Sequence, residues 1–164
     1  MTDNIQNHSL QLTTAAAVLP LSLNEVKSHL KIPDSDESED PKLIAILRGA
    51  TIAAERFTRR TFINTSWTMF MDNFPGKKLP WWSGVKQIAN TELTDLTEPI
   101  FVPRPPLSSI TSIKAQLDDG TTTTVTSTDY IVDTARVPGR VALKIGKTWP
   151  TGTLQSIKGG EVLF

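Results

Sequence analysis

The sequence contains 164 residues, which is enough to bury one sizeable core and too few for a second full domain. Lysine plus arginine equals aspartate plus glutamate at 17 each, so no overall charge attracts the protein to nucleic acid or to an anionic membrane. The absence of cysteine excludes disulfides and cysteine-ligated metals, and no apolar run reaches the ~20 residues of a membrane span. The composition therefore indicates a cytosolic product.

The first twenty residues are predicted to form a flexible N-terminal arm. Residues 1–14 are polar and aperiodic, so they cannot bury enough surface to offset the entropy lost on ordering. A short helix is expected to follow over residues 23–31. Ser22 and Glu25 can form a capping box at its start, and Pro33 disfavours helical geometry in the residue before it.

A long amphipathic helix is predicted over residues 41–60, after the acidic loop 34–39. Asp40 can accept hydrogen bonds from the first turn, and Pro41 suits the first helical position. We expect the loop to be solvated, with its charge favouring the helix N-terminus. The helix should turn an apolar stripe toward a core and organise the rest of the fold. That stripe consists of Leu43, Leu47, Ala50, Ala54 and Phe57, widened by Ile44 and Ile46.

Residues 63–164 are predicted to form a small antiparallel β-domain, which gives an α+β fold. The chain then divides into an arm (1–20), a helical segment (21–62) and this domain. Asp118-Asp119-Gly120 indicates a hairpin, because glycine supplies the positive φ that such turns need. The stretch 79–98 is expected to be a loop excursion. Strand-like runs cover residues 66–74, 100–102, 109–117, 121–126, 130–132 and 140–145, with 161–164 as a last short strand.

No pattern in the sequence predicts catalysis, a metal or a cofactor. Loop 34–39 resembles the opening of a calcium site, but Glu39 stands where glycine is needed and Ala45 where a bidentate glutamate is needed. Residues 146–148 resemble the end of a phosphate-binding loop that lacks its first glycine. The two histidines have no arranged acid beside them in the sequence. We therefore expect a protein that is not an enzyme and has no cofactor.

Two groups of residues are candidates for a subunit or partner interface. Four arginines lie on the long helix, three of them near its C-terminal end, and they suit either the helix dipole or bidentate pairing with carboxylates across an interface. Two tryptophans lie in a loop bounded by proline and glycine, and they either pack on the β-domain or anchor a partner. The candidate residues are Arg48, Arg56, Arg59, Arg60, Trp81 and Trp82.

The order of the segments is itself informative. The helical part reads LSLNEVKSHLKI at 21–32, then an acidic loop, then DPKLI to AAERFTRR within 40–60. The later part contains FPG at 74–76, PRPPLSSITSI at 103–113, DYIV at 129–132 and the segment 138–150. In this order, from about Pro20 to Pro150, the chain resembles phage head-tail connector proteins, also called adaptors, of the branch that carries a β-insertion after the long N-terminal helix.

The resemblance implies a structural virion protein, made in the host bacterial cytoplasm and located in the phage neck. Family members form a ring under the portal protein, usually twelvefold like the portal, and extend the DNA channel. They link the capsid to a stopper or tail-completion protein, and genomic DNA passes through without sequence-specific binding. Membranes are not implied as partners. The sequence departs from the family in its longer stretch 77–98 and in lacking, up to Phe164, the helices that dock on the portal. The alternative is a small nucleic-acid-binding phage or prophage protein.

Overall fold

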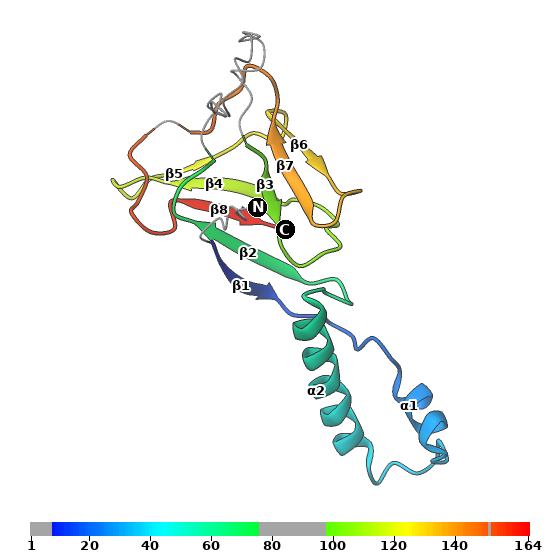
Figure 1. The fold of residues 1–164 in the computed structure, drawn as a ribbon. Helices are drawn as coiled ribbons and strands as arrows, with labels where there is room; N and C mark the ends of the chain where they lie inside the picture. The colour runs from blue at the N-terminus through cyan, green and yellow to red at the C-terminus, as the bar shows by residue number, and fades with distance from the viewer. Residues whose placement is uncertain (1–7, 76–97, 151) are drawn as a thin grey trace, which may run out of the picture. The chain divides into compact units, whose positions relative to one another are not determined.

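The computed structural model describes residues 8–75, 98–150 and 152–164 (Figure 1). The chain forms two compact units. The helical unit comprises Thr14–Thr65. The β-unit comprises Ser66–Phe164 together with the N-terminal residues through Thr13. Each unit is a continuous stretch apart from the first strand, so the local sequence signals of each can be followed separately.

The β-unit contains two sheets, in which three of the six strand pairs join strands that are not consecutive in the sequence. The five-stranded sheet has the order β1-β2-β8-β4-β5, and the pairs β2/β8, β8/β4 and β4/β5 are antiparallel. The three-stranded sheet has the order β3-β7-β6 with antiparallel pairs. The strands span β1 His8–Thr14, β2 Ser66–Met71, β3 Ile100–Val102, β4 Ser112–Gln116, β5 Thr122–Thr124, β6 Tyr130–Asp133, β7 Gly139–Leu143 and β8 Gly160–Leu163.

One apolar core is shared by both sheets. In the larger sheet, Val162 of β8 lies opposite Met69 on one side and Ile113 on the other, and all three side chains are fully buried. In the smaller sheet, Ile100 pairs with Val141, and both are also fully buried. Alternate residues along these strands face inward, as expected for sheets with one covered face. The core is completed by Met71, Val102, Leu107, Val125, Tyr130, Leu143 and Trp149.

The helical unit consists of α1 (Leu23–Leu30) and α2 (Asp40–Thr58). The capping box predicted at Ser22 and Glu25 is confirmed, because both of its reciprocal hydrogen bonds are present. The cap predicted at Asp40 is wrong. The N-cap of α2 is Glu39, which makes no side-chain cap hydrogen bond, and Pro41 occupies the first turn as expected. The helix ends at Arg59, whose left-handed φ of 55° closes the last turn.

The predicted fold class was wrong, because the described chain is mostly β rather than a long helix followed by a small β-domain. Its two helices contrast with eight strands in two sheets. The buried core lies in the β-unit, and Leu43 is the one buried residue of α2, at 9% exposure, while Phe57 at the end of its apolar stripe is 91% exposed. Helical periodicity identified the helix correctly, but it does not determine whether a core exists for the stripe to face.

The prediction of a flexible arm was also wrong for residues 8–14, which form strand β1 at the edge of the larger sheet (Figure 1). The hydroxyl oxygens of Thr13 and Thr68 lie 2.6 Å apart, and Leu10 packs against the core. Backbone pairing with β2 satisfies N–H and C=O groups of this segment, so the strand is ordered by a distant partner that the local composition does not reveal. Neither helix in the described ranges is long and apolar enough to cross a membrane.

Candidate assembly surface

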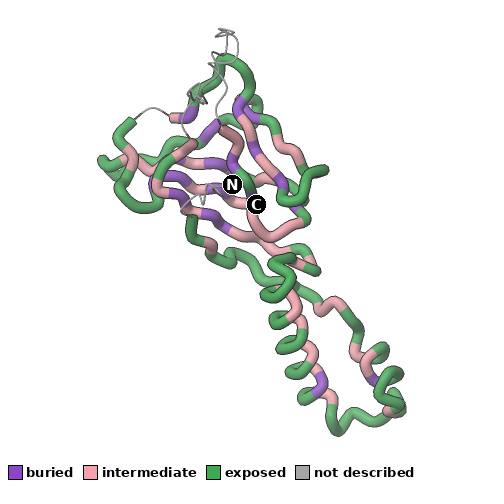
Figure 2. The backbone as a smooth tube through the Cα atoms, in the orientation of Figure 1, coloured by how far each residue is buried: buried purple, intermediate pink, exposed green. Residues whose placement is uncertain are grey.

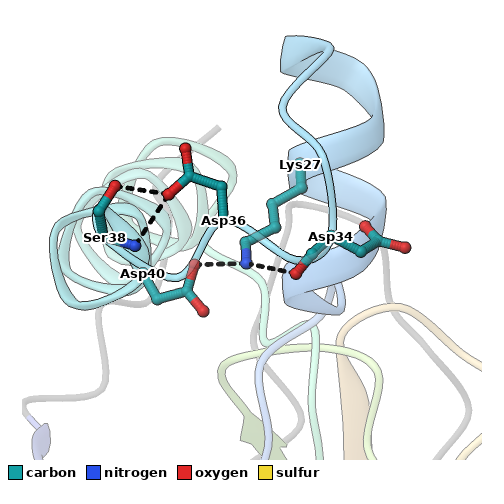
Figure 3. Close-up of polar contacts among 5 residues, drawn as sticks. All are labelled: Lys27, Asp34, Asp36, Ser38 and Asp40. Carbon is teal, nitrogen blue, oxygen red and sulfur yellow. Dashed lines mark hydrogen bonds and ion pairs between the residues drawn. The ribbon is translucent and has the colours of Figure 1, made fainter.

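A buried lysine joins the two helices of the helical unit. Lys27 of α1 is 2% exposed, and its Nζ lies 2.6 Å from a carboxylate oxygen of Asp40 at the start of α2 (Figure 3). The same ammonium donates a hydrogen bond of 3.3 Å to the backbone carbonyl oxygen of Asp34. A buried lysine needs such partners, because an unpaired charge out of water is costly. These contacts fix the position of the loop that connects the helices.

The connecting loop, residues 34–39, presents a cluster of negative charge. Its carboxylates are all exposed, on Asp34, Asp36, Glu37 and Glu39. One oxygen of Asp36 accepts hydrogen bonds from the Ser38 hydroxyl at 2.6 Å and from the Ser38 backbone N–H at 3.1 Å (Figure 3). The hydroxyl bond, and then the backbone bond, lower the pKa of Asp36. This carboxylate therefore keeps its charge in mildly acidic solution.

The exposed side of α2 combines apolar residues with cationic ones, and it has no exposed carboxylate. Figure 2 shows most of this helix as exposed. Three large apolar side chains stand in solvent along it, namely Ile46 at 59%, Ile52 at 51% and Phe57 at 91% exposure. Apart from Pro41, Thr58 and the cationic residues, the other exposed residues of the helix are alanines and Gly49. The space beside Gly49 is open, because a Cβ built there would meet nothing within 4 Å. An exposed face of this kind is typical of an interaction surface.

The four arginines named above as interface candidates lie on α2 or directly after it. Arg48 and Arg56 project from α2, Arg59 is its C-cap, Arg60 follows directly, and all four are exposed. None of them forms an ion pair with another residue of the described ranges. Positive charge at the end of a helix is stabilised by the helix dipole. This stabilisation leaves the N–H donors of the arginine side chains available for other hydrogen bonds. Their proposed interface role remains a prediction.

The two predicted tryptophans, Trp81 and Trp82, lie outside the described residues. A second exposed apolar group, which the sequence analysis did not single out, lies in the β-unit. Phe101 on β3 is 40% exposed, Ile131 on β6 is 56% exposed, and the Arg136 guanidinium stacks 5.4 Å from the centre of the Phe101 ring. Strand alternation places both residues opposite the core-facing positions. The alternating pattern of β3 and β6 could have revealed them.

No catalytic arrangement is evident in the part of the chain that the structure describes. Within it, no group of three histidine, aspartate or glutamate side chains could hold a metal ion. The clearly shifted carboxyl groups all have lowered pKa values, and each is held in the charged form first by hydrogen bonds from neighbouring residues. They are Glu25, Asp36, Asp119, Asp129 and Asp133. A general acid would need the opposite shift.

Comparison with solved structures reveals a shared fold. No protein-family model matches this sequence, and neither does any curated protein. A chain in the neck of an empty gene transfer agent (GTA) particle, computed with C6 symmetry, is 19% identical with a TM-score of 0.63. A chain in the virion of a native GTA particle is 20% identical with a TM-score of 0.55. Each alignment covers 94% of this chain and 68% of the matched chain, so the likeness extends through both units.

Proposed function

We propose that this protein is a structural component of the neck of a tailed phage or phage-like particle. In this role, copies form a ring under the portal, extend the DNA channel and link the head to the next neck or tail component. The observation that carries the proposal is the fold likeness to a chain of a GTA neck over 94% of this chain. Gene transfer agents are phage-like particles. The segment order from residue 20 to 150 independently resembles head-tail connectors.

The surface chemistry supports assembly rather than catalysis. A ring is built from heterologous contacts, in which one surface of each copy meets a different surface of the next. The helical unit offers two unlike exposed surfaces, an acidic loop and an apolar helix face bordered by arginines. The neck neighbour was computed with C6 symmetry. Rings of six or of twelve copies both comply with a sixfold axis, so the expected dodecamer remains compatible.

The experiment that tests the proposal is deletion of the gene from the phage or prophage that encodes it. We expect heads that contain portal but carry no tail, because the link below the portal is missing. Supplying the wild-type protein from a plasmid should restore tailed particles containing the protein at the neck. Normal tailed particles from the deletion strain would contradict the proposal. Free protein that binds DNA with steep salt dependence would instead favour the nucleic-acid-binding alternative.

A further inference from the structure

Charge in the helical unit is separated between its two ends. Loop 34–39 carries four exposed carboxylates, on Asp34, Asp36, Glu37 and Glu39, and no lysine or arginine. The exposed residues of α2 include Lys42, Arg48 and Arg56 but no carboxylate, and Arg59 and Arg60 follow at its end. Both surfaces belong to one compact unit, so the separation is a property of each copy.

The two charged surfaces cannot neutralise each other within one copy. The helix between them has 19 residues, which at 1.5 Å per residue corresponds to about 28 Å. The Debye length at physiological salt is about 8 Å, so attraction across the helix is screened. Lys42, in the first turn of α2, pairs with Glu39 of the loop at 3.1 Å, but both side chains are more than half exposed. Most of the acidic and basic groups therefore remain available for an external partner.

The basic end of α2 also has an apolar anchor. Phe57 lies between Arg56 and Thr58 in the last turn and is 91% exposed. Phenylalanine and arginine are both enriched at protein interfaces relative to the rest of the surface. Two copies of this surface facing each other would bring like charges together, which is unfavourable. The surface therefore favours a partner that presents anionic groups, and carboxylates are the anionic groups that this chain itself exposes.

We infer that the acidic loop 34–39 of one copy docks on the end of α2 in the next copy, against Phe57, Arg56, Arg59 and Arg60. This inference rests on the proposed ring. Each copy then gives one loop and receives one, which is the pattern that a closed ring requires. Guanidinium groups pair with carboxylates in bidentate geometry, and such pairs fix orientation as well as contributing affinity.

The loop is already ordered for this contact. Lys27 holds it through the Asp34 carbonyl and the Asp40 carboxylate, and the bond between the Asp36 carboxylate and the Ser38 hydroxyl fixes its centre. Binding by an ordered loop loses less conformational entropy than binding by a flexible one. The carboxylates of Asp34 and Glu37 make no hydrogen bond or ion pair to another described residue, so they are the groups that can point to a neighbour.

A charge-swap experiment tests this contact directly. The helix variant carries Arg56→Glu and Arg60→Glu, and the loop variant carries Asp34→Lys and Glu37→Lys. These sites avoid the Arg59 C-cap and the Asp36 hydrogen bonds. A control carries Lys144→Glu and Lys158→Glu, which reverses two exposed charges in the β-unit and also removes the contact of the Lys158 ammonium, 4.6 Å from the centre of the Phe70 ring. Circular dichroism and thermal melting establish that each variant is folded, and mass photometry with negative-stain microscopy measures rings, formed alone or on the portal.

We expect each two-residue reversal to reduce ring formation at least tenfold, while the control assembles like the wild type. The chain that carries all four reversals should regain rings, because its loop is basic and its helix end is acidic. An equimolar mixture of the helix and loop variants should also form rings, with the two chains alternating. Rings from either variant alone, or no recovery in the four-site chain, would overturn the inferred contact and leave the neck role standing. If the wild type forms no ring in either setting, the proposed function itself fails.

Discussion

Lys27 Nζ lies 2.6 Å from the Asp40 carboxylate, and its side chain is only 3% exposed. This pair connects α1 to the first turn of α2, and the Asp34 carbonyl supplies a second acceptor. Sequence signals at Asp40 suggested a helix cap, but the carboxylate is used for the ion pair. The arrangement explains how two short, largely exposed helices are held as one unit.

Replacing one member of this pair should destabilise the helical unit. Asp40→Asn leaves the buried ammonium of Lys27 without its counter-charge, and we expect a loss of about 2 kcal/mol, reduced from the fully buried case because Asp40 is 21% exposed. Urea unfolding followed by circular dichroism at 222 nm measures the change. The control Lys42→Met removes an exposed ion pair and should change stability by about 0.5 kcal/mol or less. Equal effects of the two substitutions would contradict this account.

The capping box of α1 should make this helix sensitive to acid. The Ser22 backbone N–H, at 2.7 Å, and the Ser22 hydroxyl, at 2.8 Å, donate to Glu25 and lower the pKa of that carboxyl. The stabilising contribution is therefore fully present above the unfolded pKa of about 4.3 and is lost as the pH falls through the lower folded pKa.

NMR chemical shifts of the α1 backbone between pH 6 and pH 2 would reveal this loss. We expect the shifts to change with a midpoint below the usual glutamate range. In Glu25→Gln, which keeps an oxygen acceptor but cannot titrate, this step should be absent. The same midpoint in wild type and variant would mean that another group controls the transition.

Two glycines should respond oppositely to alanine. A Cβ at Gly159 would lie 2.7 Å from the Asp72 carbonyl oxygen and 2.9 Å from that of Gln155, so backbone would have to move. We expect Gly159→Ala to destabilise the β-unit by about 2 kcal/mol. Gly49 has open space around its Cα in the middle of α2, and Gly49→Ala should stabilise by about 1 kcal/mol through helix propensity. Thermal denaturation measures both, and a Gly159→Ala protein as stable as the wild type would contradict the close backbone contacts at Gly159.

The stability of the β-unit should depend on the packing of Val162 against Met69 and Ile113 on the two neighbouring strands. Ile113 is fully buried opposite Val162, so Ile113→Ala is expected to lose about 3 kcal/mol through lost burial and the remaining cavity. Ile131→Ala is the matched control, because its side chain is 56% exposed and should lose about 0.5 kcal/mol. Chemical denaturation of each variant gives the comparison. Similar losses at the two positions would place Ile113 outside the core.

Local structure was largely predictable from the sequence because its signals are local. The Ser22 capping box, Pro41 in the first turn of α2 and the glycine turn at Gly120 all act within a few residues. The hairpin predicted there is confirmed as the pair β4/β5, and Gly120 has a φ of 86°. Each signal satisfies backbone groups or fixes φ without reference to the rest of the chain.

The arrangement of these elements was not predictable. Strand β8, which the sequence suggested only as a short last strand, lies in the middle of the five-stranded sheet between β2 and β4. That position depends on partners about 50 and 90 residues away in the chain. The same limit explains the wrong fold class, since the apolar stripe of α2 has no core beside Phe57. At the candidate surface, the arginines and the acidic loop were visible in the sequence, whereas the exposure of Phe57 required the structure.

The most direct test of the neck role is electron microscopy, with two-dimensional averaging, of the purified protein mixed with the portal encoded beside it. The account predicts an added ring, coaxial with the portal and below it, whose rotational symmetry is compatible with the sixfold axis used for the GTA neck. Free copies of the protein beside bare portals, at concentrations where both are folded, would contradict the account.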